Sequence, residues 1–242
     1  MTTLFEATHE VGDLSEWDDS SGTIAVNASA AMAGTSSGAD FTLSASSNAH
    51  LAAEFTASSD QLHIRFYVDR DNEIQGNSEE HRCLFKFGAN DQGGLMFGTT
   101  SGGSKYGRLF IKNDGRTSTS WGAQTTWDSG AQYIEIVIYK ATGPAAGDAY
   151  AEWYSDGVLK ERSPAAGGID LYDDWPDEFQ FGGWYQDTNT SGNIYFDQVK
   201  IADDLSMIGP HIAGGAGRAG GAARAGGGTR AGGSGRAGSG AR

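Results

Sequence analysis

The stretch Gln61-Leu62-His63-Ile64-Arg65-Phe66-Tyr67-Val68 alternates between polar and apolar side chains. In a β-strand, alternate residues point to opposite faces, so one face would carry Leu62, Ile64, Phe66 and Val68, and the other Gln61, His63, Arg65 and Tyr67. The apolar face predicts a core, and the polar face predicts a surface that meets solvent or a ligand. The stretch therefore favours an antiparallel sheet that is buried on one side.

The same period of two recurs along the chain. Cys83, Phe85 and Phe87 alternate with Arg82, Leu84 and Lys86, and the isoleucines of residues 134–138 alternate with Tyr133, Glu135, Val137 and Tyr139. Further strands are expected at 95–98, 106–112, 178–185 and 193–201, and Asp156-Gly157 suits a type I′ hairpin turn. No sustained helical stripe interrupts them. The body is predicted to be an all-β, two-sheet antiparallel jelly-roll sandwich without a helix of twelve or more residues.

Composition excludes several classes of protein. The 242 residues contain one cysteine, Cys83, so neither an intrachain disulfide framework nor a multi-thiolate metal site can form. No run of 18 apolar residues is present, and the first residues lack the basic and apolar segments of a secretory signal. We expect a protein that does not insert into membranes and carries no visible signal peptide.

Composition changes sharply near residue 210. Residues 211–242 contain 13 Gly, 9 Ala and 5 Arg, so they cannot bury a core. Removing five arginines from the 17 basic residues leaves 12 against 31 acidic ones, a net charge of about −19 for the body. The chain is thus predicted to consist of a domain, 1–210, and a basic low-complexity tail, 211–242.

The tail is periodic, because an arginine recurs every six residues at Arg218, Arg224, Arg230, Arg236 and Arg242. Six residues are two turns of a three-residue helix, so a polyglycine or polyproline II conformation would place all five arginines on one face. An extended assembly arm that contacts other copies or neighbouring acidic subunits is one interpretation. A flexible tail and a non-specific phosphate-binding arm are the alternatives, and specific nucleic-acid recognition is not expected.

The two ends of the body carry a family resemblance. Leu4-Phe5-Glu6 with Gly12-Asp13-Leu14-Ser15-Glu16-Trp17, and the closing 192–201 segment Gly-Asn-Ile-Tyr-Phe-Asp-Gln-Val-Lys-Ile, resemble the concanavalin A-like, LamG-like jelly-roll superfamily. The resemblance spans about residues 4–202. It implies that the first and last strands lie side by side, in a fold whose members bind glycans, cleave polysaccharides or build surfaces and virions.

The last strand contains a candidate metal ligand. The alternation places Tyr195, Asp197, Val199 and Ile201 on one face, which makes Asp197 an inward acid. A buried carboxylate needs a hydrogen-bond donor or a cation. Glu6, which the resemblance places on the adjacent strand, and the Asp13 loop would supply further oxygens for a structural Ca²⁺. A carboxylate that caps a backbone turn is the alternative. The acidic loop 69–73 is interpreted as solvated charge.

Two groups of residues are candidates for glycan contact. The polar face of Gln61, His63, Arg65 and Tyr67 would be extended by Arg82 and Lys86, with tyrosines and Gln180 from neighbouring strands. A second group at the loop ends contains Trp175, Trp184 and Tyr185, and Trp121 and Trp127 offer a further aromatic pair. Aromatic rings stack on sugars, whereas Arg and Gln bind hydroxyl and carboxylate groups. An ordinary solvent-facing sheet and loop anchors are the alternative readings.

The same polar residues also suit catalysis in part. His63, Tyr67 and Arg65 are suitable types for β-elimination on a uronate polymer, but the Tyr-Phe-Lys segment of the superfamily's alginate lyases is not matched, and the acidic body would repel a polyanion. The Glu-x-Asp-x-x-Glu strand of laminarinase-like glycosidases is absent.

The sequence therefore favours a non-catalytic structural or adhesive module of a virion or extracellular surface, such as a fibre or decoration protein that contacts glycans. A polysaccharide lyase and a purely structural subunit without a ligand are the rivals.

Overall fold

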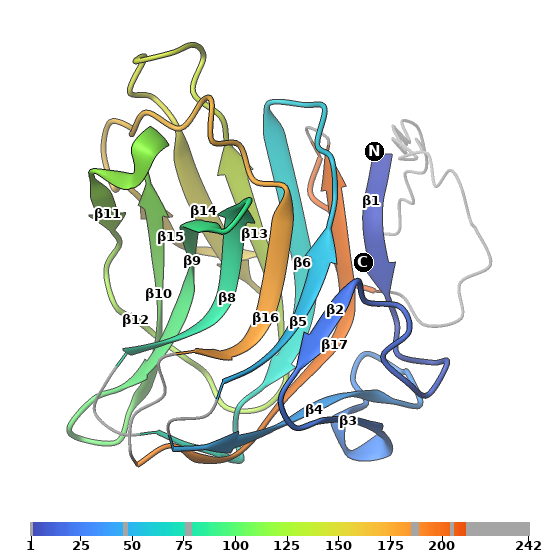
Figure 1. Ribbon diagram of the computed structural model, residues 1–242. Helices are drawn as coiled ribbons and strands as arrows, with labels where there is room; N and C mark the ends of the chain where they lie inside the picture. Colours follow the sequence, from blue (N-terminus) through green and yellow to red (C-terminus); the bar gives the residue numbers. More distant parts are fainter. Residues whose placement is uncertain (1, 46–47, 76–78, 185–188, 204–205, 212–242) are drawn as a thin grey trace, which may run out of the picture.

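The computed structural model describes residues 2–45, 48–75, 79–184, 189–203 and 206–211, which form two antiparallel sheets packed face to face (Figure 1). Sheet A contains β1 (Thr2–Ala7), β3 (Ile24–Asn27), β4 (Gly38–Ser44), β6 (Gln61–Asp69), β7 (Glu73–Ile74), β13 (Gln132–Tyr139), β14 (Tyr150–Ser155), β15 (Val158–Ser163) and β17 (Ser191–Asp203). Sheet B contains β2 (Asp19–Ser21), β5 (Ala49–Glu54), β8 (Glu79–Phe87), β9 (Asn90–Thr99), β10 (Lys105–Lys112), β11 (Thr119–Trp121), β12 (Thr125–Thr126) and β16 (Glu178–Trp184). The two short 3₁₀ turns are η1 (Ala28–Ala30) and η2 (Asp114–Arg116).

This architecture confirms the predicted all-β sandwich. The order in sheet A is β15-β14-β13-β6-β17-β4-β3, with β1 and β7 also paired to β17, and the order in sheet B is β11-β10-β9-β8-β16-β5-β2, with β12 also paired to β10. β1 and β17 are antiparallel neighbours, so the first and last strands of the body lie side by side, as the family resemblance implies (Figure 1). The strand that contains residues 61–68 is β6, which lies between β13 and β17 near the middle of sheet A.

The core lies between the sheets and follows the predicted alternation. All four apolar residues of β6 and the three isoleucines of β13 are buried in it, with Phe179 and Phe181 of β16 opposite. The hairpin between β14 and β15 is also confirmed, because Asp156 and Gly157 both have positive φ angles, as a type I′ turn requires. Cys83 faces this core as a free thiol, and burial raises its pKa well above the ordinary value.

Two of the β-bulges in the described sheets change where predicted residues lie. The pairing of β17 with β6 shifts between Asp197 and Lys200, and Gln198 has a φ of 51°. Phe196 and Val199 both face the core as a result, so the prediction that Asp197 shares a face with Val199 and Ile201 is wrong. Asp197 is nevertheless fully buried, beneath the segments that follow β1 and η1.

The second bulge lies in β8, between His81 and Cys83. It directs Arg82 into a buried ionic cluster at one end of the sandwich, where Arg82 pairs with Glu73 at 2.6 Å and with Glu80. Arg70 joins the cluster through Glu73, at 2.7 Å. The interpretation of loop 69–73 as solvated charge is therefore wrong for Arg70 and Glu73, which are 0% and 3% exposed.

The predicted tail begins where the described chain ends. Residues 206–211 lie against sheet A, and the five arginines of the repeat, Arg218, Arg224, Arg230, Arg236 and Arg242, lie outside the described residues. No helix in the described part of the chain is long and apolar enough to cross a membrane.

Candidate functional site

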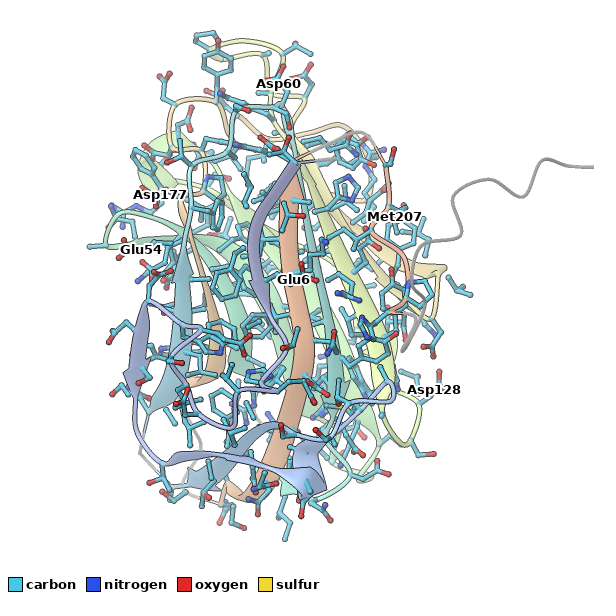
Figure 2. The ribbon with its side chains drawn as sticks, turned by 90° about the vertical axis from the view of Figure 1, so that its right-hand side faces the viewer. Glu6, Glu54, Asp60, Asp128, Asp177 and Met207 are labelled. Atoms are coloured by element: carbon cyan, nitrogen blue, oxygen red, sulfur yellow. The ribbon has the colours of Figure 1, made fainter. Side chains whose placement is uncertain are left out.

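The polar face predicted on β6 exists, but it is closed. His63, Arg65 and Gln61 do point away from the core together, and they are 1%, 2% and 8% exposed. The residues 206–211, which we call the strap, lie over this face: Figure 2 shows Met207 of the strap on the sheet A side of the molecule. A polysaccharide therefore cannot reach these side chains in the arrangement described.

The strap is held by backbone hydrogen bonds to sheet A. Ile208 N and Gly209 N donate to the two carboxylate oxygens of Glu135, at 2.7 and 3.2 Å. His211 N donates to the Tyr67 hydroxyl, at 2.9 Å. Because these donors belong to the main chain, the contact cannot be predicted from the side chains of residues 206–211.

Glu135 is the centre of the buried cluster under the strap. Its carboxylate also lies 2.9 Å from His63 Nδ1 and accepts from the Tyr133 hydroxyl. Burial disfavours the charge on Glu135, but the hydrogen bonds from His63, Tyr133 and the strap outweigh it and lower the pKa of this carboxyl. Burial also lowers the pKa of Arg65. Among the described residues, His63 Nε2 and Arg65 Nε have no hydrogen-bond partner.

Of the residues expected to extend the polar face, the tyrosines of β13 and β14 do lie on sheet A, whereas Arg82, Lys86 and Gln180 belong to sheet B. Arg82 lies in the buried ionic cluster, so it cannot contact a ligand on either outer face. Lys86 pairs with Glu178 of β16 at 3.4 Å, and Gln180 lies two residues further along that strand. The alternation along β6 showed which of its residues share a face, but it did not show which strands share a sheet.

The outer face of sheet B is built differently, around exposed aromatic rings. Leu84, Met96 and Phe110 form an apolar floor outside the main core, and Trp184 packs against it. Trp121 stacks on Phe110 with ring centroids 5.1 Å apart and 29° between the planes. We call these five residues the aromatic face. Trp121 is 46% exposed, so its ring is available to a ligand.

Polar groups surround the aromatic face. The Arg108 guanidinium lies 5.1 Å from the Trp121 ring centroid and donates to Gly122 O, whereas Trp184 stacks on His50 at 5.6 Å. Strand pairing places Gln180, Leu84, Gly94, Phe110 and Trp121 in one row across five strands. Four interstrand steps make this row roughly 19 Å long.

A groove of about 670 Å³ lies at one end of the same sheet. Its lining includes Asp18, Glu54, Asp177 and Glu178. Figure 2 shows Glu54 and Asp177 near each other on the side of the molecule opposite Met207. Asp18 accepts from Glu54 N at 2.8 Å, and Asp177 accepts from Gly88 N at 2.9 Å, so two of the acids fix loop ends.

The other predicted aromatic contacts lie elsewhere. Trp175 is buried, with the Lys140 ammonium 5.7 Å from its ring centroid. Trp127 is a core residue that stacks on Trp153. Tyr185 lies outside the described residues. Of the loop-end aromatics, Trp184 reaches the aromatic face. Trp121 was singled out in the sequence, but its position beside Phe110 depends on the short pairing of β10 with β11.

The three carboxylates predicted to bind calcium do not come together. Glu6 is exposed and lies 3.4 Å from Lys200 Nζ, and Asp13 accepts from Ser15 N. Asp197 accepts from Met32 N at 2.8 Å and from the Thr35 hydroxyl, and it lies 3.4 Å from His9 Nδ1. The structure shows Asp197 as a carboxylate that ties loops to β17. No group of three or more His, Cys, Asp or Glu side chains within the described ranges is arranged to hold a metal ion, and calcium binding stays a prediction.

Comparison with known proteins identifies the fold. No protein-family model matches the chain, and no curated protein does. Among solved structures, "Cellulose induced protein, Cip1" is similar with a TM-score of 0.57 and 15% identity, over 85% of this chain and 99% of that one. The catalytic domain of the glycoside hydrolase family 131 protein from Coprinopsis cinerea gives 0.56 and 12%, over 86% and 98%. The chain has the concanavalin A-like jelly-roll fold.

Proposed function

We propose that this chain is a non-catalytic module that binds a polysaccharide across the aromatic face of sheet B, as part of an extracellular or virion surface. The observation that carries the proposal is the placement of Trp121 and Trp184 on one outer face, at the two sides of an apolar floor. Aromatic side chains are commonly buried in a protein core, whereas the Trp121 ring is 46% exposed beside an apolar floor and is therefore available to contact a ligand.

The chemistry of the aromatic face suits sugar rings. The C–H faces of a sugar stack on aromatic rings, and its hydroxyl groups bind the polar groups at the edge of the ring. Gln180, Lys86 and Arg108 provide such polar groups around the floor. A row of roughly 19 Å fits several consecutive sugar rings rather than a monosaccharide.

Charge narrows the class of polysaccharide. The body has a net charge of about −19, which repels polyanions. We therefore expect a neutral glycan to bind better than a uronate polymer. The two similar structures support a carbohydrate ligand, because one is named for its induction by cellulose and the other is a glycoside hydrolase domain.

The geometry does not favour a lyase built on His63, Tyr67 and Arg65. These residues share a face of β6, as the sequence indicates, but the strap lies over His63 and Arg65, which are almost fully buried. Virion or fibre membership rests on the periodic tail and is part of the proposal.

The test is affinity electrophoresis and calorimetry with soluble β-glucan, xylan and a uronate polymer. Trp121→Ala should weaken binding of the preferred neutral glycan about tenfold or more, and Trp184→Ala should act in the same direction. Leu159→Ala, a change at a 50% exposed apolar residue of sheet A, is the control and should leave binding unchanged.

Binding that survives both tryptophan changes would overturn the assignment to the aromatic face, and absence of binding to every polymer would overturn glycan recognition. An unsaturated product from the uronate polymer would favour the lyase instead.

A further inference from the structure

A small pocket lies where the strap meets sheet A. It has a volume of about 320 Å³ and is lined by Tyr67, Tyr133, Asp156, Gly157 and Pro210. Tyr67 and Tyr133 lie on neighbouring strands, β6 and β13, and Asp156-Gly157 is the turn between β14 and β15. The strap supplies Pro210 as a wall. We call this the tyrosine pocket, and it belongs to the opposite sheet from the aromatic face.

The lining of the tyrosine pocket suits a cation. The Tyr67 and Tyr133 rings lie 5.7 Å apart at 46°, so they present two π surfaces. Asp156 adds an exposed carboxylate, one oxygen of which accepts from Tyr133 N at 3.1 Å. None of the five lining residues carries a positive charge. Aromatic faces beside a carboxylate attract ammonium or guanidinium groups.

The Arg65 side chain does not fill the tyrosine pocket. The Arg65 guanidinium lies 6.0 Å from the Tyr67 ring centroid, but Arg65 is buried and is not one of the lining residues. Burial lowers the pKa of Arg65, and the carboxylates of Glu6 and Glu135 oppose this effect. The partly exposed Tyr67 ring and the exposed Asp156 carboxylate are therefore the parts of the pocket that a second cation would contact.

The sequence itself contains a series of suitable cations. The strap ends at His211, whose N–H donates to Tyr67, and the Gly/Arg repeat follows directly. Its arginines recur every six residues, and its charge of about +5 opposes that of the body. A guanidinium is planar, so it both stacks on tyrosine and binds a carboxylate through two N–H groups, which lysine does not do.

We propose that the tyrosine pocket binds an arginine side chain from the 212–242 repeat of another copy of this chain. Each body offers a tyrosine pocket and each tail carries five arginines, so a single tail can contact several bodies. In an extended chain, six residues span roughly 19 Å, which separates successive arginines beyond the width of the pocket. A tail-to-body contact of this kind is heterologous and builds rings or filaments.

The test uses the full chain as a receptor with its five tail arginines changed to glutamine, so that its own tail does not compete. The probe is a fluorescent peptide of residues 212–242, followed by anisotropy at low salt. Asp156→Asn removes the charge of the pocket but keeps an acceptor for Tyr133 N, and should weaken binding about five- to tenfold. The control Asp60→Asn changes an exposed aspartate that directly precedes β6, whereas Tyr67 lies near the other end of that strand, and it should leave binding unchanged (Figure 2).

A second pair of variants tests the ring. Tyr67→Leu removes a π surface and should weaken peptide binding as much as Asp156→Asn does. Tyr67→Phe keeps the ring and should retain most of the binding. Trp121→Ala should have no effect, which separates this proposal from glycan binding. Urea unfolding of each variant confirms that the receptor is folded.

Three results would overturn the proposal. The first is that the peptide does not bind. The second is that Asp60→Asn weakens peptide binding as much as Asp156→Asn does, which would indicate a general attraction between the acidic body and the basic peptide. The third is that Tyr67→Leu has no effect on peptide binding. Light scattering decides whether the contact joins copies: the unmodified chain should form oligomers that Asp156→Asn dissociates. A monomer that binds the peptide through the pocket would contradict the role of a second copy.

Discussion

The outer faces of the two sheets differ in composition and in what covers them. That of sheet A is rich in polar and ionisable groups, yet His63, Arg65 and Glu135 are almost fully buried because the strap lies over them. That of sheet B has an apolar floor, yet Trp121 and Trp184 remain partly exposed above it. The polar side chains along a strand therefore did not predict which outer face is accessible to a ligand.

The physical reason is that a polar face can be buried when donors and acceptors are supplied to it. The strap supplies two backbone N–H groups to Glu135, so covering this carboxylate leaves it fully hydrogen-bonded. An exposed tryptophan has no such requirement at its ring face and remains available to a ligand. The comparison separates a face that stabilises the fold from one that is suited to binding.

The largest effect is expected at the centre of the covered face. Glu135→Ala removes the acceptor shared by His63, Tyr133 and the strap, and should lower the free energy of unfolding by about 3–5 kcal/mol. Gln180→Ala on sheet B should cost less than about 1 kcal/mol, because its described partner is the neighbouring Glu178. Urea unfolding at neutral pH measures both, and equal costs would remove the distinction between the faces.

The loss of stability at acid pH should also depend on Glu135. Because the folded-state pKa of Glu135 is lowered, its stabilisation is complete above the ordinary glutamate pKa and is lost as the pH falls through the folded value. Glu135→Gln should therefore show a weaker loss of stability than the unmodified chain between neutral and acid pH.

A second buried carboxylate should respond to pH in the opposite direction. Glu161 of β15 accepts from Leu109 N and Trp153 Nε1 where the two sheets meet, but burial raises its pKa to about 7. Its protonated form is favoured in the fold, so stability is present below the ordinary pKa and is lost as the pH rises through 7. Glu161→Gln should gain about 1–3 kcal/mol relative to the unmodified chain between pH 4.5 and pH 8. Parallel unfolding curves across this range would contradict the assignment.

The strap can be loosened without changing either sheet. Ile208→Pro removes the N–H that donates to Glu135 and should lower stability by about 1–2 kcal/mol, with faster hydrogen exchange of the His211 amide. Met207→Pro is the matched control, because the structure gives Met207 N no described hydrogen-bond partner. If Ile208→Pro and Met207→Pro change stability and hydrogen exchange equally, the hydrogen bond to Glu135 does not hold the strap.

The smallest effect is expected on the open face. Trp121→Ala should lower the free energy of unfolding by less than about 1 kcal/mol, because nearly half of its surface is already exposed. Thermal unfolding measures this change next to the glycan assay. A cost above about 2 kcal/mol would show that Trp121 serves the core, and loss of glycan binding would then reflect unfolding.

Several elements could be predicted because their signals are local. The alternation in 61–68 identified β6 and its buried side, and Asp156-Gly157 identified a hairpin from backbone preference alone. Trp184 was predicted as a contact residue and lies on the proposed site. Arg82 was misplaced, because one extra residue at a bulge reverses a face and leaves no mark in composition.

Sequence by itself determined the sheet class, the inward side of the central strands, the acidic body and the boundary of the arginine repeat, since periodicity, charge and backbone preference are properties of neighbouring residues. Tertiary structure decided which strands share a sheet, that the strap covers His63 and Arg65, and that Trp121 lies above Phe110. These outcomes depend on contacts between residues far apart in the chain. The backbone N–H of Ile208 donates to Glu135 of β13, and a backbone donor leaves no pattern in the side chains from which the contact could be predicted.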